Sequence, residues 1–323
     1  MKKEAVPAAG PGTGGSGEIK LYSRRTRVIR ENIELWSFVI PAAALIIMFN
    51  YAPMYGIIIA FQNYFPGSPF LGENTQWVGL KHFRDFINSI YFGRIMRNSI
   101  RLSLLNLLFG FWLPIIFALI LNELKNLKFK KFVQTASYLP HFISTVVVAG
   151  MAISFCQPTG LVNLILGAFG VAPQSWLDMP GKFPMIYTII NVWKSFGFNS
   201  ILYFSTLSAI DPSLYESARI DGGNRWQQCW HITLPGLKSI IAIQFILALG
   251  GILNTNSDLV ILIYNPATYE TADVIGSYTY RIGIQDGRYS YTTAVGLFMS
   301  AIGFALTFIA NKISNWLTGF GLW

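Results

Sequence analysis

Stretches without charged residues limit the fold of this chain more than any other feature of its sequence. Five of them contain no Asp, Glu, Lys or Arg, and one more contains a single Lys. They cover residues 35–61, 102–121, 132–156, 183–210, 239–257 and 290–311. A helix that crosses the ~30 Å hydrocarbon core of a bilayer needs about 20 largely apolar residues, because each residue advances the helix by only ~1.5 Å. Each stretch is therefore long enough to cross.

We predict an all-α membrane protein with six transmembrane helices. The expected spans cover about residues 35–61, 99–121, 132–156, 183–207, 238–257 and 290–311. The composition agrees, because 53% of the 323 residues are hydrophobic and only 12% are charged, whereas roughly 25% of the residues of a soluble domain are charged. Buried helices of a large soluble domain would not produce six such stretches.

The formal net charge of +9 is explained by the membrane and requires no nucleic acid partner. Cytoplasmic loops of membrane proteins carry an excess of Lys and Arg. With the N-terminus in the cytoplasm, most of the 24 basic residues fall in cytoplasmic segments. We expect both termini to be cytoplasmic, residues 1–30 to form a disordered basic N-terminus, and residues 31–323 to form the transmembrane domain.

The loop between the fourth and fifth predicted spans has the features of an ordered element. Asp211 is a suitable N-cap, and Pro212 suits the first position of a helix. Gly222 and its neighbour Gly223 then permit a sharp turn.

A second short helix is expected after that turn. Trp226 and Trp230, four residues apart, place two rings on one helical face. Pro235 should then break the chain before the fifth span. We interpret this ordered cytoplasmic loop as a docking element.

Seven residues of the same loop follow a fixed spacing. They are Glu216, Ser217, Ala218, Gly222, Ile232, Leu234 and Pro235. The spacing resembles the signature of permease subunits of ATP-binding-cassette importers, in which Glu-Ala-Ala is followed by three residues, Gly, nine residues, Ile, one residue and Leu-Pro. Ser217 in place of the usual Ala is the one departure.

This resemblance implies a type I ABC importer permease fold, in which the loop forms a coupling helix seated in a groove of the ATP-hydrolysing subunit. Glu216 would meet a basic or backbone partner there, Ala218 would allow close approach, and Gly222 would give the bend. The implied docking residues are Tyr215, Glu216, Ser217, Ala218, Asp221, Gly222, Ile232, Leu234 and Pro235.

Shorter motifs along most of the chain indicate which branch of these permeases the sequence resembles. They lie at residues 77–83, 160–163, 176–177, 191–194, 264–266, 273–275, 280–283 and 294–298. The first four are similar to motifs of sugar permeases. The last four look like those of the branch of permeases that import polysaccharide fragments, including alginate-type and pectin-derived oligosaccharides. One departure is that residues 255–258 are Thr-Asn-Ser-Asp, where that branch usually continues Gly-Phe-Glu after Leu-Asn.

The resemblance implies import of oligosaccharides across the bacterial cytoplasmic membrane by alternating access. The implied partners are a second permease subunit in a heterodimer, two ATP-binding subunits, an extracellular solute-binding protein and the lipid bilayer. A permease for a non-sugar solute and a non-transporting membrane sensor or scaffold stay open as alternatives. An ion-coupled secondary transporter is disfavoured, because such proteins carry ionisable residues inside their spans and only Lys194 lies clearly inside one here.

The sequence contains no motif for ATP hydrolysis or metal binding by this chain. It contains no Gly-x4-Gly-Lys-Ser/Thr phosphate loop, because Gly181 and Lys182 are followed by Phe183 and lack the upstream Gly. Its three histidines are scattered and form no pair with metal-ligand spacing. We therefore expect no enzymatic activity, no cofactor and no metal in this chain, and ATP hydrolysis by separate partner subunits.

Polar side chains inside the predicted spans are candidates for a substrate pathway. Polar groups within a bilayer are costly unless they meet partners or water, so the polar face of the fourth span should point inward. The candidates are Thr188, Asn191, Trp193, Ser195, Asn199 and Tyr203 in the fourth span and Asn254, Asn256 and Asp258 beside the fifth. Substrate contact and hydrogen bonding between helices both stay open for them.

Overall fold

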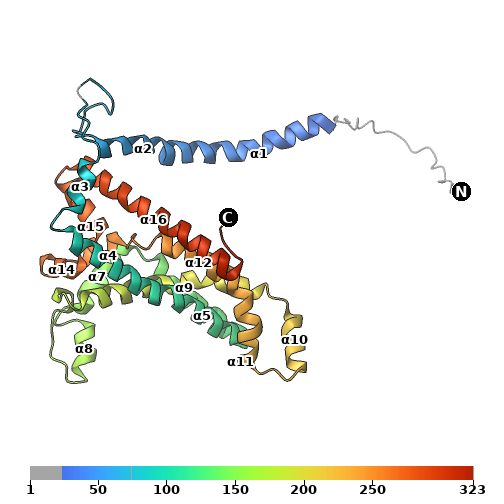
Figure 1. Cartoon of the computed structure of the whole chain (residues 1–323). Helices are drawn as coiled ribbons and strands as arrows, with labels where there is room; N and C mark the ends of the chain where they lie inside the picture. The colour runs from blue at the N-terminus through green and yellow to red at the C-terminus, as the bar shows by residue number, and fades with distance from the viewer. Residues whose placement is uncertain (1–23, 74, 323) are drawn as a thin grey trace, which may run out of the picture. The chain divides into compact units, whose positions relative to one another are not determined.

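The computed structural model describes residues 24–73 and 75–322 of the chain (Figure 1). Over these residues the regular structure is helical, with no β-strand apart from one isolated bridge between Gln62 and Trp77. The predicted all-α class is therefore confirmed. The chain divides into two compact units, Met1–Gly56 and Ile57–Trp323.

The described part of the first unit belongs to the first apolar stretch. Helix α1 (Arg24–Ile46) continues through a π-helical turn (Ile47–Tyr51) into α2 (Ala52–Met54). The predicted disordered segment 1–30 lies outside the described residues as far as residue 23, whereas residues 24–30 are helical. The boundary between the two units follows Gly56, and the start of the transmembrane domain at residue 31 stays a prediction.

The second unit contains the other helices. They are α3 (Lys81–Ile87), α4 (Phe92–Asn106), α5 (Trp112–Glu123), α6 (Leu127–Tyr138), α7 (Thr145–Cys156), α8 (Leu161–Gly167), α9 (Phe183–Ser208), α10 (Pro212–Ile220), α11 (Arg225–Gln228), α12 (Leu234–Gly250), α13 (Ser257–Ile263), α14 (Tyr269–Ala272), α15 (Ile275–Tyr280) and α16 (Tyr289–Thr318).

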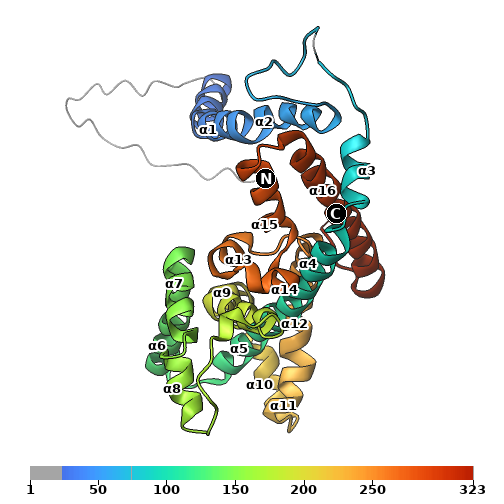
Figure 2. The same cartoon turned by 90° about the vertical axis from the view of Figure 1, so that its left-hand side faces the viewer.

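Long helices packed side by side form the body of this unit (Figures 1 and 2). Helix α5 packs along α9, and α12 packs along α16. A π-helical turn (Leu107–Phe111) joins α4 to α5, and α4 also contacts α9. Helices α10 and α11 lie at one end of this body and α8 and α14 at the other (Figure 1); we refer to them as the α10 end and the α14 end.

The predicted third span, residues 132–156, is divided in the structure. Helix α6 ends at Tyr138, a short 3₁₀ turn (Leu139–Phe142) follows, and α7 begins at Thr145. Pro140 has no N–H to continue a helix. Ser144 has an extended backbone, and its hydroxyl accepts a hydrogen bond from the N–H of Val147 at 3.3 Å, which starts a new helix. The sequence prediction missed this interruption.

Five helical segments of the described residues are long and apolar enough to cross a membrane. They are Leu35–Phe61, Phe92–Glu123, Thr145–Gly167, Arg225–Gly250 and Tyr289–Trp316. Helix α9 is also long enough to cross, since its 26 residues extend ~39 Å at ~1.5 Å each. Its polar residues Asn191, Lys194 and Asn199 lower its mean hydropathy, and it is not among these five segments. The count of six spans therefore stays a prediction.

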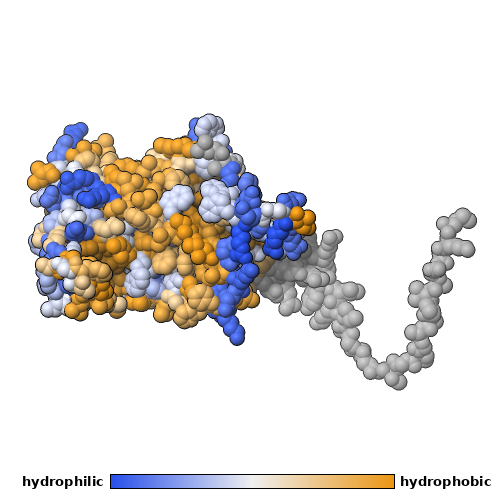
Figure 3. All heavy atoms as spheres, turned by 90° about the horizontal axis from the view of Figure 1, so that it is seen from below, coloured by the Kyte–Doolittle hydropathy of each residue, from blue (hydrophilic) through white to orange (hydrophobic). Residues whose placement is uncertain are grey.

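The surface of the protein carries the polarity expected of a spanning bundle. On the face drawn in Figure 3, apolar side chains occupy a broad middle region, and hydrophilic side chains gather toward its two ends. Lipid contact favours this arrangement, because the hydrocarbon core cannot hydrogen-bond to polar groups, whereas the interfaces can.

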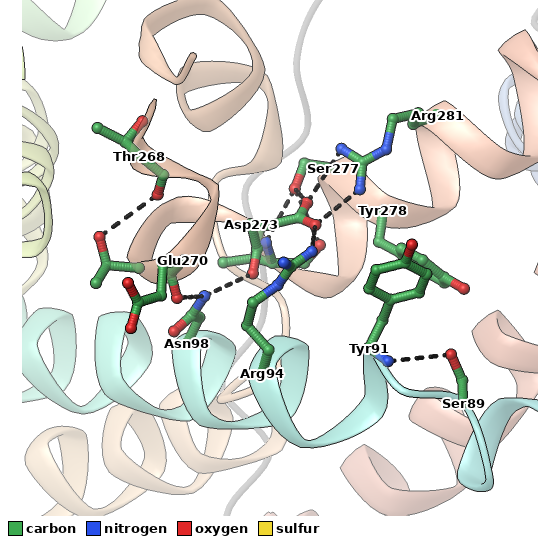
Figure 4. Close-up of polar contacts among 12 residues, drawn as sticks. Ser89, Tyr91, Arg94, Asn98, Thr268, Glu270, Asp273, Ser277, Tyr278 and Arg281 are labelled. Atoms are coloured by element: carbon green, nitrogen blue, oxygen red, sulfur yellow. Dashed lines mark hydrogen bonds and ion pairs between the residues drawn. The ribbon is translucent and has the colours of Figure 1, made fainter. Parts of the chain in front are cut away.

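A buried ion-pair network fixes the α14 end (Figure 4). The Asp273 carboxylate is fully buried, and its Oδ2 accepts hydrogen bonds from Arg281 at 2.7 Å and from Arg94 at 3.1 Å. Ser277 donates to Oδ1 at 2.8 Å, and Asn98 donates to the backbone oxygen of Asp273 at 3.1 Å. The network joins α4 to the segment that connects α14 with α15.

The charge state of Arg281 follows from the same contacts. Burial by itself lowers the pKa of this guanidinium. The hydrogen bonds and the negative charge of Asp273 outweigh that effect and raise the pKa above its usual value. Arg281 therefore stays charged at any physiological pH, and the pair persists.

We predict that Asp273→Ala destabilises the protein strongly, because it leaves two arginines without their common partner. Removing one member of a buried pair costs about 3–5 kcal/mol. Arg94→Ala should cost less, since its side chain is 30% exposed and Arg281 remains on the carboxylate. The measurement is the melting temperature of the purified protein in detergent, with the exposed Asp286 changed to Ala as the control. Equal melting temperatures for Asp273→Ala and Asp286→Ala would contradict the prediction.

Candidate functional site

The loop between α9 and α12 begins with the predicted capped helix. Asp211 has an extended backbone, and its Oδ1 accepts a hydrogen bond from the N–H of Ser213 at 2.9 Å. Pro212 occupies the first turn of α10, where its missing N–H removes no helical hydrogen bond. The hydrogen bonds from Ser213, the backbone one first, lower the pKa of the Asp211 carboxyl. The cap therefore stays ionised at neutral pH.

The predicted bend after α10 is confirmed, and both glycines are required for it. Gly222 has φ +79°, a left-handed conformation that other L residues rarely adopt. The N–H of Gly223 donates to the carbonyl oxygen of Ala218 at 2.7 Å. A Cβ on Gly223 would lie 2.7 Å from that same oxygen, so a larger residue there must displace the end of α10.

The second half of the loop differs from the prediction at Pro235. Asn224 caps α11 through a reciprocal pair of hydrogen bonds with Gln227. The rings of Trp226 and Trp230 meet edge to face at 6.0 Å, as expected for two residues on one face. The chain does not break at Pro235, which lies in the first turn of α12. A π-helical turn (Cys229–Thr233) precedes it, and this wider turn admits the proline ring without ending the helix.

Two side-chain contacts attach the loop to the body of the unit. Arg225 forms an ion pair with Glu123, the last residue of α5, with a 2.9 Å distance between Nη1 and Oε2. The Tyr215 hydroxyl lies 3.1 Å from the Thr233 hydroxyl at the start of α12. These contacts connect the loop to the end of α5 and to the start of α12.

The residues predicted to dock differ in their exposure. Glu216, Ser217, Asp221, Gly222 and Pro235 are exposed. Tyr215, Ala218, Ile232 and Leu234 are half-buried and hold the loop in place. Glu216 forms no ion pair or side-chain hydrogen bond with any residue that the structure describes. Its carboxylate is therefore open to a partner, and docking itself stays a prediction.

A second candidate site is a partly open cavity of 680 Å³ between the helices of the second unit. Its wall comes from α4, the Leu107–Phe111 turn, α5, α9, α12 and the segment that follows α12. Ligand pockets in proteins typically have volumes of about 300–1,000 Å³. The polar residues of the wall are Ser103, Asn106, Tyr187, Asn199, Tyr203, Ser205, Gln244, Asn254, Thr255 and Asn256.

A chain of amide groups connects three segments at this wall. The Asn191 side chain donates to Asn106 Oδ1 at 2.8 Å, and the Asn256 side chain donates to Asn191 Oδ1 at 3.0 Å. The backbone N–H of Asn256 donates to the Tyr187 hydroxyl at 3.0 Å. Asn256 Oδ1 also caps α13, because it accepts from the N–H of Leu259 at 3.2 Å. The chain thus ties α4, α9 and the start of α13 together.

The predicted pathway residues fall into separate groups. Asn199, Tyr203, Asn254 and Asn256 line the cavity, as an inward polar face requires. Asn191 does not line the cavity. Its side chain is hydrogen-bonded to the side chains of Asn106 and Asn256, which do.

The other four candidates lie elsewhere. Thr188 and Trp193 line a different, largely apolar pocket of 310 Å³. Ser195 donates to the backbone oxygen of Asn191 at 2.8 Å. Asp258 is exposed in the first turn of α13 and does not line the cavity. Contact with substrate stays a prediction for all nine residues.

Sequence reasoning missed several polar residues of the wall, notably Asn106, Tyr187, Gln244 and Thr255. Asn106 is the one amide residue in the charge-free stretch 102–121, and Gln244 lies in a similar stretch, 239–257. An amide inside an apolar run must find a partner or water, and that signal could have identified both.

Comparison with known proteins places the chain in a family. Residues 110–318 match the family described as "Binding-protein-dependent transport system inner membrane component". The chain belongs to this family. The matched residues include the whole loop between α9 and α12 and most of the cavity wall, so the resemblance inferred from the loop is confirmed.

Relatives are similar over nearly their whole length. The "Polygalacturonan/rhamnogalacturonan transport system permease protein YteP" of Bacillus subtilis (strain 168) is 38% identical over 299 residues, which cover 90% of this chain and 92% of that protein. "Protein LplB" of the same organism is 38% identical over 283 residues, which cover 87% and 88%.

Solved structures support the same family and fold. One is the crystal structure of a bacterial ABC transporter involved in the import of the acidic polysaccharide alginate, with a TM-score of 0.81, 40% identity and coverage of 92% of this chain and all of that one. Another shows a bacterial alginate ABC transporter in complex with an alginate pentasaccharide-bound periplasmic protein, with a TM-score of 0.82, 39% identity and coverage of 92% and 99%. The type I ABC permease fold is thereby shown.

We predict that Gly223→Val loosens the loop, because its Cβ would collide with the Ala218 carbonyl. The strain should cost about 1–3 kcal/mol and expose the peptide bonds after Arg219 and Arg225 to trypsin. Gly181→Val is the matched control, since a Cβ there meets nothing within 4 Å. The measurement is the rate of tryptic cleavage in detergent. Equal rates for the two variants would show that the contact does not constrain the loop.

Proposed function

We propose that this chain is the membrane-spanning subunit of an ATP-driven importer that carries oligosaccharides, as polysaccharide fragments, across the bacterial cytoplasmic membrane. The single observation that carries the proposal is a cavity of ligand size, lined by amide and hydroxyl groups, inside a fold shared with an alginate importer. Sugars offer many hydroxyl groups that both donate and accept hydrogen bonds, and amides and hydroxyls match both roles.

The proposed assembly contains a second, related permease, two ATP-binding subunits and an extracellular solute-binding protein. One alginate transporter structure is a complex with a periplasmic protein that holds a pentasaccharide, which supports the solute-binding partner. Both termini of this chain lie in the cytoplasm, and the α10 end faces the ATP-binding subunits. ATP hydrolysis belongs to those subunits, and this chain has no catalytic residue, cofactor or metal of its own.

The proposed mechanism is alternating access. ATP-driven closure of the ATP-binding subunits pulls the α10 loop, which acts as the coupling helix. The Arg225–Glu123 and Tyr215–Thr233 contacts transmit the movement to α5 and α12. Both helices contribute residues to the cavity wall, so their displacement opens the cavity outward, and hydrolysis resets the inward state.

We predict that Glu216→Lys lowers saccharide uptake at least tenfold while the protein stays in the membrane. The reversed charge would oppose the basic or backbone partner expected for this exposed carboxylate, and a like-charge contact at an interface costs several kcal/mol. The measurement is uptake of labelled saccharide by cells that carry equal amounts of each variant. Glu73→Lys, an exposed acid outside the α10 loop, is the control. Normal uptake by Glu216→Lys would contradict a role of the α10 loop in docking to the ATP-binding subunit.

We expect tagged protein from native membranes to co-purify with a second permease and an ATP-binding subunit. The measurement is mass spectrometry of every chain retained in mild detergent. A binding protein specific for an amino acid or an inorganic anion in the same complex would favour a permease for a non-sugar solute. Recovery of the chain alone in several mild detergents would favour a membrane sensor or scaffold.

A further inference from the structure

Helix α6 has one face packed against the bundle and one face that no described part of the chain covers. The packed face lies on α9, where Ser137 comes so close to Gly197 that a Cβ on Gly197 would overlap the Ser137 backbone. The Lys130 side chain turns the same way, and its ammonium lies 4.5 Å from the centroid of the Phe204 ring. The orientation of α6 is therefore fixed, and its opposite face points away from the bundle.

The uncovered face of α6 combines ammonium groups with aromatic rings. Lys128 and Lys131 are exposed there, and residues three apart are neighbours on a helix surface. The rings of Phe129 and Phe132 beside them are 52% and 68% exposed. Lys125 adds a third exposed ammonium just before the helix begins. Lysines next to bulky apolar side chains are typical of helices that lie at a membrane surface.

The three exposed lysines have no acid partner within the described residues. Glu123 is the acid nearest to them along the chain, and its carboxylate already pairs with Arg225 at 2.9 Å. Neither Lys125, Lys128 nor Lys131 forms an ion pair with any residue that the structure describes. Like charges so close together repel one another, so they favour an anion that comes from outside the chain.

Two neighbouring features indicate the depth of these lysines in the membrane. Lys131 is the last charged residue before the charge-free stretch 132–156. Phe204, which Lys130 contacts, lies about one turn before the end of α9 at Ser208. Both features place the lysines at the boundary between hydrocarbon and water, where the phosphates of phospholipids lie.

We propose that Lys128 and Lys131, together with Lys125, bind the headgroup of an anionic phospholipid whose acyl chains lie against Phe129 and Phe132. A phospholipid supplies both a negative charge and hydrocarbon at this depth, whereas an acidic protein surface would supply the charge alone. A net negative headgroup is required, because the choline of a zwitterionic lipid already neutralises its phosphate. The inference goes beyond transport, and only the leaflet rests on the proposed function: with the α10 end in the cytoplasm, the lipid belongs to the cytoplasmic leaflet.

The test uses the full-length chain in mild detergent. The probes are dioctanoyl phosphatidylglycerol, dioctanoyl phosphatidylcholine and glycerophosphoglycerol, which is the headgroup of the first lipid without its acyl chains. Native mass spectrometry over a range of probe concentrations measures the fraction of protein that carries each probe. We expect phosphatidylglycerol to bind roughly tenfold more tightly than either of the others. Equal affinity for the two lipids, or for phosphatidylglycerol and its bare headgroup, would overturn the inference.

Matched variants on one helix assign the binding to its uncovered face. Lys128→Gln and Lys131→Gln should each weaken phosphatidylglycerol binding about fivefold, and the double variant about 25-fold. Lys130→Gln is the control, because it removes the same charge from the same helix but from a side chain turned to α9. It should change the affinity less than about twofold. Equal losses for all three single variants would show a general attraction to positive charge and overturn the site.

The apolar half of the site and the competing occupant are tested separately. Phe132→Ser should weaken binding of phosphatidylglycerol and leave that of glycerophosphoglycerol unchanged, and an unchanged affinity for the lipid would contradict the acyl-chain contact. Co-purification of the Lys128→Gln/Lys131→Gln variant from native membranes tests for a protein occupant. Loss of the ATP-binding subunit with unchanged lipid binding would assign this face to that subunit and overturn the inference. Lipid binding by the chain in detergent requires no transport, so its absence would leave the proposed function standing.

Discussion

The hydrogen bonds among Asn106, Asn191 and Asn256 are the interaction on which the interior of this protein depends. Lipid cannot satisfy an amide, so each of these side chains has to find a partner inside the bundle. They find one another across three separate segments, α4, α9 and the start of α13. These hydrogen bonds fix which faces of those helices point inward. They also leave a polar-lined cavity where apolar side chains would otherwise close the space.

The two ends of the second unit are held by different kinds of contact. At the α14 end, a fully buried carboxylate joins two arginines, and removal of the carboxylate is costly because it leaves both arginines without their common partner. At the α10 end, both side chains of the Arg225–Glu123 pair are at least half exposed, and such pairs typically contribute about 0–1 kcal/mol. The α14 end is therefore held by a stronger ionic contact than the α10 end.

The sequence was sufficient for features that depend on neighbours along the chain. The charge-free stretches, the Asp211 cap and the Gly222 bend needed only local chemistry, whereas the pattern around Glu216 was interpreted from its resemblance to a family signature. The interruption at Ser144 and the π-helical turn before Pro235 were missed, because helical periodicity cannot tell whether a proline ends a helix or is absorbed by a wider turn. The partners of Asn191 could not be predicted either, since they depend on how distant helices rotate against one another, and no pattern within one stretch specifies that rotation.

The continuity of α12 explains how a loop and a cavity so far apart along one helix can act together. Because the π-helical turn absorbs Pro235, residues from Arg225 to Gly250 form one helical segment. Arg225 holds the loop at one end of it, and Gln244 and Ala248 line the cavity further along. A break at Pro235 would have left a hinge that absorbed any displacement of the loop. The unbroken segment connects the loop to the cavity wall without such a hinge, as the proposed mechanism requires.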